Sequence, residues 1–455
     1  MAFTARKPLR IVSNRVLWLC QPTTVPLALR WIASTPFLAP FLAPFFSAFL
    51  AMLLALVHTG AWAQMQPASA AYGIQFVCTP AQLERLQQEM PRYLQSLGIA
   101  PALVRARVDT LHNTATYALV GASTDSSTLY LAWRPELGIR DDVVALPSAQ
   151  GQQKMVETVS KKEIVLTLLH PGRLTTLQGR ACDVQALVDH VGIRQNTVLW
   201  AQELHWKWPD GGSAYWNRPY WDAGTPQPGV PLRDALNDLF FSQSRYAIGC
   251  YTATKMVYAQ AVLDYYARVK ANRVAAARVS LRLLGDNEPL VDIEPARMWS
   301  FEPDFDPAER ERPGKLLRLL DGVATNHFVP GDWVYILNTD ERTYQKTGYE
   351  GSNAIYLGRN RFDDYYNDNV HHYSFKEKLG EVFQWRHGVF SRSRDYAKRQ
   401  PLASEDYERL SATPERGGLV LGYRAVPYFF GFERLPPMNS LAPPQPTQPQ
   451  RASTN

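Results

Sequence analysis

The chain has 455 residues, and its 48 Lys and Arg residues outnumber its 42 Asp and Glu residues, which gives a pI near 9.0. The excess lies at the start: residues 1–63 hold five basic residues and no acidic one, and the rest of the chain has 43 basic against 42 acidic residues. That balance does not favour a nucleic-acid partner. The remaining length, about 390 residues, predicts one large domain or two modest ones.

Residues 1–63 have the features of a secretory signal peptide. The basic residues precede an apolar stretch at 37–57, and the small-residue pattern Ala61-Trp62-Ala63 follows it. We predict cleavage before Gln64 and export to a periplasmic or extracellular location. The alternative is an uncleaved anchor, and the chain would then contact a membrane only through this leader. No later segment approaches the ~20 apolar residues that a span needs.

Three cysteines remain once Cys20 leaves with the leader. In an oxidising compartment an odd number of thiols is informative. We predict that Cys78 pairs with Cys182 and that Cys250 stays free. The alternative is three buried, unpaired cysteines, because free Cys is often a core residue.

The N-terminal region, residues 64–160, is predicted to be a small α/β region. Leucines and Tyr93 recur at helical spacing between Pro80 and Leu97. Residues 147–153 resemble a loop. The expected strands are residues 116–120, 127–133 and 163–169. A larger domain should cover residues 161–435, and the tail 436–455, rich in Pro and Gln, should be disordered.

Cys250 is the candidate nucleophile. Apolar residues after it recur with the spacing of a buried helix, and Gly249 stands just before that helix. A cysteine at a helix start meets unpaired backbone N–H groups and the positive end of the helix dipole. Both favour the thiolate, which is the nucleophile, and the same N–H groups could stabilise an oxyanion. The alternative is that Cys250 is only a small apolar residue opening a core helix.

Two segments beyond this helix should be strands, at residues 333–337 and 351–358. The first follows a Pro-Gly-Asp turn that ends at Asp332, where the carboxylate should help to form the turn. A helix that carries the nucleophile, followed by strands, is the papain-like arrangement.

Three blocks of this sequence resemble the spore-coat type of bacterial transglutaminase. The run Tyr246–Tyr258 resembles its nucleophile segment, in which Tyr-Ala-Phe-Glu-Cys-Ala-Thr-Ala opens a helix. The run His327–Asn338 resembles its His-Phe-x-x-Gly-Asp-x-x-Tyr-x-x-Asn motif. Tyr349–Gly358 resembles its Trp-x-Gly-Glu-Asn-Val-Ile-x-Leu-Gly strand. The blocks keep the family's order and span roughly residues 215–380.

The resemblance implies an α+β, papain-like catalytic domain, close to that of the cell-wall endopeptidases of the NlpC/P60 kind. It implies acyl transfer from a protein glutamine to a lysine amine through a thioester on Cys250, with no metal or organic cofactor. The partners would be protein substrates. No Cys/His spacing resembles a zinc site, and we expect no metal.

Three positions depart from the family pattern. The acidic residue that precedes the family's cysteine is Gly249 here. The glutamate of the Gly-Glu-Asn strand falls on Ser352, and the histidine beyond that strand falls on Tyr365. The nucleophile position therefore matches, whereas the positions of its catalytic partners do not.

His371 and His372 are the nearest candidates for the base that a cysteine nucleophile needs. Because neighbouring strand residues point to opposite faces, only one of the two imidazoles could face Cys250. Asp364 is the predicted orienting group, with Asp363 and Asn353 as further candidates. The residues assigned to substrate binding are Asn353, Ser352, Tyr365 and Trp333.

Two other functions remain open from the residues alone. A cysteine peptidase or amidase acting on cell-wall peptides would use the same nucleophile with water as acceptor. A binding or structural protein on a catalytic scaffold would explain the missing Glu and His, and its Cys250 would be unreactive.

Overall fold

The computed structural model describes residues 72–209, 212–284, 317–344, 346, 348–367, 371–387, 389 and 399–427. The predicted signal peptide and the predicted C-terminal tail lie outside these residues. Among the helices of the described part, none is long and apolar enough to cross a membrane.

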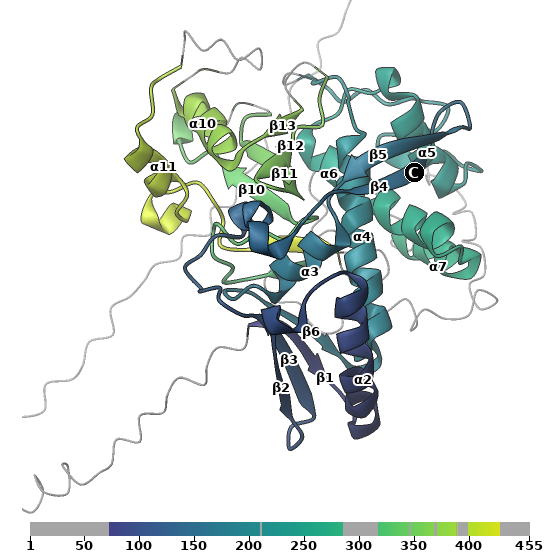
Figure 1. Ribbon diagram of the computed structural model, residues 1–455. Coiled ribbons are helices and arrows are strands. Elements are labelled where there is room, and N and C mark those ends of the chain that lie inside the picture. Colours follow the sequence, from purple (N-terminus) through teal and green to yellow (C-terminus); the bar gives the residue numbers. More distant parts are fainter. Residues whose placement is uncertain are drawn as a thin grey trace, which may run out of the picture. The chain divides into compact units, whose positions relative to one another are not determined.

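A four-stranded sheet forms the N-terminal region, with α2 packed beside it (Figure 1). Its order is β2-β3-β1-β6; β1 is antiparallel to β3 and parallel to β6. The bounds are β1 Gly73–Val77, β2 Val104–Asp109, β3 Thr114–Leu119 and β6 Leu174–Gln178. The predicted strand at 116–120 is thus confirmed. The sheet takes β6 from beyond residue 160, where the sequence analysis set a domain boundary.

Helix α2, Pro80–Ser96, confirms the predicted helix and follows from its sequence. Thr79 and Gln82 form a capping box, and Pro80 stands at the first position, where its missing N–H costs nothing. The buried side chains recur every three or four residues, so one stripe faces the core. They are Leu83, Leu86, Met90 and Leu94.

Two predicted strands are helical. Residues Thr128–Trp133 form a 3-10 helix that begins where the Ser127 hydroxyl accepts the Leu129 N–H at 3.2 Å. Residues Lys161–Leu169 form α3, whose N-cap Ser160 accepts the Glu163 N–H. Every residue from 163 to 169 is buried, and such short apolar runs do not separate strand from helix by periodicity. The predicted loop at 147–153 joins the hairpin of β4 Asp142–Pro147 and β5 Gln153–Thr158.

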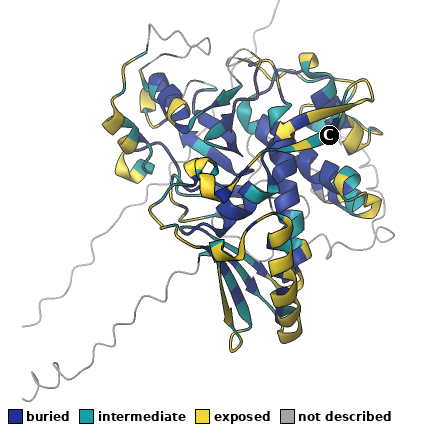
Figure 2. Cartoon of the chain, viewed as in Figure 1, coloured by how far each residue is buried: buried dark blue, intermediate teal, exposed yellow. Residues whose placement is uncertain are grey.

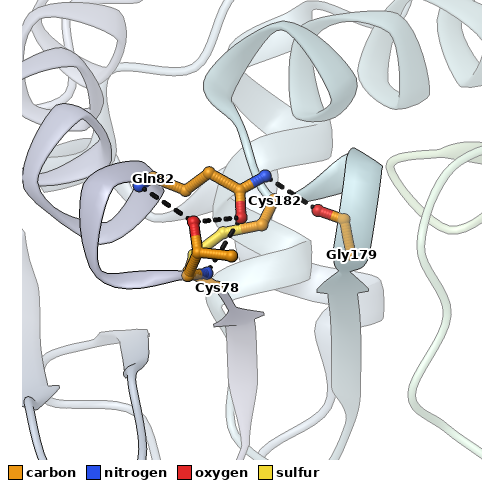
Figure 3. Close-up of a disulfide and its surroundings, with 5 residues drawn as sticks. Cys78, Gln82, Gly179 and Cys182 are labelled. Carbon is orange, nitrogen blue, oxygen red and sulfur yellow. Dashed lines mark hydrogen bonds between the residues drawn. A yellow bond between two sulfur atoms is a disulfide. The ribbon is translucent and has the colours of Figure 1, made fainter.

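A disulfide joins Cys78 to Cys182, and Cys250 is free, as predicted (Figure 3). The bond links the end of β1 to the start of α4, Val184–Gln202, across 104 residues of sequence. Beside it, the Gln82 amide donates to the Gly179 carbonyl at 2.9 Å. This crosslink fastens the N-terminal sheet to the helix that leads into the rest of the molecule.

A six-stranded antiparallel sheet and two buried helices form the larger part of the molecule (Figure 1). The predicted strands at 333–337 and 351–358 are confirmed as β10 and β11. The sheet order is β13-β12-β11-β10-β14-β9. The bounds are β9 Leu317–Leu320, β10 Trp333–Leu337, β11 Gly351–Gly358, β12 Arg361–Asp363, β13 His372–Tyr373 and β14 Arg424–Pro427.

Helices α4 and α6 pack against each other and against β11, whereas α10 covers β10 to β13. Helix α6, Cys250–Asp264, is buried from residue 252 onward. In Figure 2, α4 and α6 are largely dark blue, the colour of buried residues, and other helices surround them. A helix that is buried on all sides is a core helix. The fold is therefore α+β, as expected. The other elements are α5 Leu232–Phe241, α7 Arg273–Leu284, α9 Glu341–Tyr344, α10 Phe375–Arg386, α11 Ser404–Leu410, β7 Trp221–Asp222 and β8 Thr225–Pro226.

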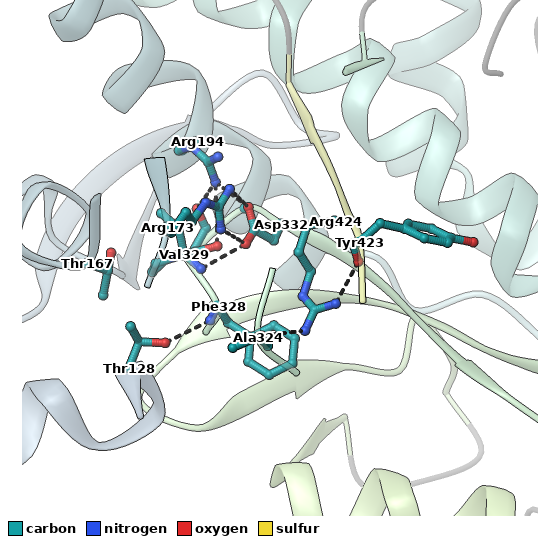
Figure 4. A network of polar contacts seen from close by, with 12 residues as sticks. Thr128, Thr167, Arg173, Arg194, Ala324, Phe328, Val329, Asp332, Tyr423 and Arg424 are labelled. Carbon is teal, nitrogen blue, oxygen red and sulfur yellow. Dashed lines mark hydrogen bonds and ion pairs between the residues drawn. The ribbon is translucent and has the colours of Figure 1, made fainter. Parts of the chain in front are cut away.

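Asp332 holds several of these elements together through a buried charge cluster (Figure 4). Its carboxylate pairs with Arg173, which precedes β6, and with Arg194 of α4 at 2.8 Å. It also accepts the Val329 N–H at 2.9 Å, which closes the predicted turn before β10. Burial works to raise the pKa of Asp332, but the two guanidinium charges prevail and lower it to about 2. All three charged groups are almost completely buried.

Replacing Asp332 with Asn should lower the free energy of unfolding by about 3–5 kcal/mol at pH 7, because two buried guanidinium groups would lose their counter-charge. The carboxylate has a lower pKa folded than unfolded, so its stabilisation is complete above pH 4 and is lost as the pH falls toward 2. Urea unfolding should therefore show a smaller difference in the free energy of unfolding between wild type and Asp332→Asn at pH 2.5 than at pH 7.

The matched control is Asp340→Asn at the far end of β10, where the carboxylate pairs with the exposed Arg342. That variant should unfold close to wild type. Equal stability of the Asp332→Asn variant and the wild-type protein at pH 7 would contradict the structural role of the cluster.

Candidate active site

Cys250 is the first residue of α6, as the sequence predicted. Its N-cap is Gly249, which has ordinary extended backbone and no side chain to cap the helix. The N–H groups of the first turn have no intrahelical partner, as in any helix, and no N-cap side chain accepts from them. A Cβ added at Gly249 would meet no atom within 4 Å, so neither backbone conformation nor crowding demands glycine there.

Asn353 on β11 faces this sulfur. Its Nδ2 donates to Cys250 Sγ at 3.5 Å. The indole Nε1 of Trp333, on β10, donates to Asn353 Oδ1 at 2.9 Å. Because an indole N–H can only donate, it must meet the amide oxygen, and the amide NH₂ must then face the sulfur. Trp333 thus orients the one described side chain that is hydrogen-bonded to Cys250.

Aromatic rings fix the indole in turn. Tyr251, the second residue of α6, lies with its ring centroid 5.4 Å from that of Trp333, and Tyr258 stacks on it at 6.2 Å. Tyr335, the cross-strand partner of Asn353, also lies near the nucleophile. Burial, followed by the Cys250 charge, raises the pKa of Tyr335 far above its usual range. No pattern in the sequence marks Tyr335, because the face of its strand that meets Cys250 depends on tertiary packing.

Ser352 and Asp364 lie on the opposite face of the sheet. Ser352 Oγ is 3.4 Å from Lys378 Nζ of α10, and Asp364 pairs with the same ammonium group at 3.2 Å. Glu381 and the Tyr373 hydroxyl complete this buried polar cluster. Side chains of neighbouring strand residues point to opposite faces of the sheet. Because the Asn353 side chain points toward Cys250, that of Ser352 must point away from it. The structure therefore does not bring the predicted Asp364 and Ser352 to the nucleophile.

Tyr365 is brought close to the nucleophile helix, but it bonds to another side chain. Its hydroxyl lies 2.9 Å from Thr254 Oγ1, which itself donates to the Cys250 carbonyl. Tyr365 is fully buried, and burial raises the pKa of its phenol well above 10. Its φ of 55° is a conformation that non-glycine residues rarely adopt. Tyr365 therefore acts as a neutral hydrogen-bonding group that fastens the segment after β12 to α6.

His371 and His372 gather with other polar groups beyond the end of α4. His371 Nε2 donates to the Gln202 carbonyl at 3.0 Å and lies 3.4 Å from Asp363 Oδ1. Its ring stacks on His205 with centroids 4.0 Å apart. Burial, chiefly, lowers the pKa of His371 to about 3 and that of His372 to about 4, and it raises the pKa of Asp363 well above its usual range. In the described part of the chain, no hydrogen bond joins either imidazole to Cys250.

The arrangement combines a candidate nucleophile with hydrogen-bond donors. The thiol, the first-turn N–H groups of α6 and the Asn353 amide lie together between a buried helix and a sheet. Donors placed beside a sulfur suit both a thiolate and the oxyanion of a tetrahedral intermediate. The fold and this site define a domain suited to acyl transfer through cysteine.

Comparison with known proteins places the domain in a family. Residues 182–386 match the family model of protein-glutamine gamma-glutamyltransferase, an acyltransferase family. This stretch runs from the disulfide at Cys182 to the end of α10 at Arg386, and its match agrees with the transglutaminase resemblance of the sequence.

Among solved structures, the transglutaminase from Geobacillus stearothermophilus, without its C-terminal extension, is similar at 19% sequence identity and a TM-score of 0.34. The similarity covers 55% of this chain and 96% of that one. The comparison with curated proteins found no match.

Replacing Asn353 with Ala should slow alkylation of Cys250 by iodoacetamide about 10-fold at neutral pH, because a hydrogen bond to a charged group contributes about 1.5–3 kcal/mol. Trp333→Phe should give a smaller loss, since it frees the amide to rotate without removing it. Mass spectrometry of the Cys250 peptide gives the rate.

Ser352→Ala is the matched control, because Ser352 is the neighbour of Asn353 on the same strand and points to the other face. Its alkylation rate should equal that of wild type. If the Asn353→Ala variant also reacts at the wild-type rate, the amide does not support the thiolate.

Proposed function

We propose that this domain cross-links proteins by transferring the γ-acyl group of a glutamine side chain to a lysine amine, with Cys250 as the nucleophile. The observation that carries the proposal is the position of Cys250 at the first residue of a buried helix, with the Asn353 amide directed at its sulfur. A nucleophile on a helix that packs against an antiparallel sheet fits the papain-like arrangement. We extend that comparison to the NlpC/P60 kind as part of the proposal.

The reaction balances in two steps. The sulfur attacks the glutamine carboxamide carbon, the C–N bond breaks, and ammonia leaves with the thiol proton, so that a thioester remains. The lysine amine then attacks the thioester, the C–S bond breaks, and an amine proton returns to the sulfur. Each half passes through an oxyanion, and we assign its stabilisation to the Asn353 amide and the N–H groups at the start of α6.

The group that carries the proton differs between this site and the family pattern. The family's glutamate position is Ser352, which faces Lys378, and the family's histidine position is Tyr365, which faces Thr254. The roles of His371 or His372 as base remain predictions. Since the proton lost in the first step is regained in the second, the carrier need only hold it transiently.

We further propose that the protein works outside the cytoplasm on protein substrates that carry accessible Gln and Lys side chains. The Cys78–Cys182 disulfide supports this, because such bonds persist in oxidising compartments. The predicted signal peptide is the other support.

The deciding experiment follows a fluorescent primary amine into a glutamine-rich protein. The purified protein should incorporate the amine and release ammonia, and Cys250→Ala should reduce incorporation at least 1,000-fold, because it removes the covalent intermediate. Cys78→Ala with Cys182→Ala is the control for loss of a sulfur elsewhere, and it should keep activity wherever it stays folded. Ammonia release without amine incorporation would point instead to hydrolysis.

A second candidate is a binding protein on an inactive scaffold. The observation that favours it is that no described imidazole or carboxylate is hydrogen-bonded to Cys250. Slow alkylation of Cys250, at the rate of an ordinary exposed thiol, together with no amine incorporation, would establish this alternative.

Gly249→Glu tests the missing partner directly. The family has an acidic residue at this position, and the structure leaves open space there. A carboxylate beside the sulfur could carry the proton between the two steps, so we expect amine incorporation to rise about 10-fold or more. The Gly249→Gln variant offers the same shape without a basic group and should not gain activity. Equal rates for the two variants would argue against a missing base at this position.

A further inference from the structure

Three side chains beyond the end of α4 have the donor set of a metal site. Asp363, His371 and His372 each offer a ligand atom, and these atoms lie within 4.8 Å of one another. Asp363 ends β12 and pairs with His372 across to β13, so the backbone ladder brings them together. From the sequence, these three residues were candidates for acid–base chemistry and not metal ligands, because they lack the spacing of a zinc motif.

The same three residues carry buried atoms without hydrogen-bond partners. Asp363 is fully buried, and its Oδ2 has no partner; nor do His371 Nδ1 and His372 Nδ1 within the described structure. A buried polar atom that loses its partners costs about 1–3 kcal/mol, so three such atoms close together call for a common partner.

The tautomer of His371 favours a metal as that partner. Its Nε2 faces the Gln202 carbonyl, and a carbonyl oxygen can only accept, so Nε2 carries the proton. The lone pair is then on Nδ1, the ring atom without a partner, so His371 would bind the ion through Nδ1 and not through Nε2, which lies 3.4 Å from Asp363 Oδ1. Imidazoles that bind metals are oriented in this way, with the other N–H held by a backbone carbonyl or a carboxylate.

We propose that Asp363, His371 and His372 bind one divalent transition-metal ion, with Zn²⁺ as the best fit to two imidazoles and a carboxylate. Water can take the fourth place on the ion. This site replaces the expectation of no metal that came from the sequence.

The ion's role would be structural. The Trp206 N–H, next to His205, donates to the Tyr365 carbonyl at 2.7 Å, and the Tyr366 hydroxyl donates to the Ile248 carbonyl just before the nucleophile helix. An ion on Asp363 and His371 would fix the start of the segment that carries Tyr365 and Tyr366. It would thereby stabilise the backbone just before Cys250. The proposal does not depend on the acyl-transfer reaction.

The test uses chelator-stripped full-length protein. Titration with Zn²⁺ against a chromophoric chelator should show one tight site per chain, and Asp363→Asn, His371→Gln and His372→Gln should each weaken it at least 100-fold. His112→Gln, an exposed histidine beside Asp109, is the matched control and should bind as wild type does. Zn²⁺ should also raise the melting temperature of wild type and not that of the three variants.

Co²⁺ loading of the wild-type protein keeps the test independent of how the variants fold. A visible spectrum of nitrogen and oxygen ligands, without a thiolate charge-transfer band, is expected and would exclude binding at Cys250. Absence of stoichiometric Zn²⁺ binding, or undiminished binding by the three variants when folded, would overturn the proposal. If the titration shows no Zn²⁺ binding and the His371→Gln variant no longer incorporates amine, the metal proposal is overturned and His371 is the catalytic base instead.

Discussion

The buried pairing of Asp332 with two arginines ties the turn before β10 to α4 and to the segment before β6. A carboxylate this deep is stable only with its counter-charges, and Arg173 and Arg194 come from two distant parts of the chain. Their meeting point is the turn before β10. The Tyr258 hydroxyl donates to the Gly331 carbonyl of this turn at 2.7 Å, so helix α6, which begins at Cys250, is fastened to the same turn. One polar cluster thus sets the positions of α4, α6 and the sheet.

The geometry of the site follows from that arrangement. Helix α6 packs on β11 and, through Tyr251, on Trp333 of β10, and Asn353 of β11 faces the first residue of the helix. Trp333 follows Asp332 directly, and its indole decides which end of the Asn353 amide meets the sulfur. The electrostatic cluster and the hydrogen bond at the nucleophile are therefore adjacent steps in one chain of contacts.

The departures from the family pattern have a structural counterpart. Where a glutamate would stand, Ser352 joins a buried Lys378 cluster, and where a histidine would stand, Tyr365 closes a hydrogen bond with Thr254. Each substitution is satisfied locally, so neither leaves a gap at the site. The imidazoles that the sequence offered as replacements gather instead around Asp363.

Elements with local signals could be predicted from the sequence. They are the helix that opens at Cys250, strands β10 and β11 and the capped helix α2, because caps, turns and periodicity are written in neighbouring residues. The Cys78–Cys182 bond joins residues 104 apart, and its prediction rested on the odd number of thiols instead. Tertiary structure decided the rest. Residues 163–169 were predicted to be a strand and form a helix. A wholly buried run has no hydrophobic periodicity that distinguishes the two. Which face of β11 meets the nucleophile, and which charges neutralise Asp332, depend on packing between segments more than a hundred residues apart.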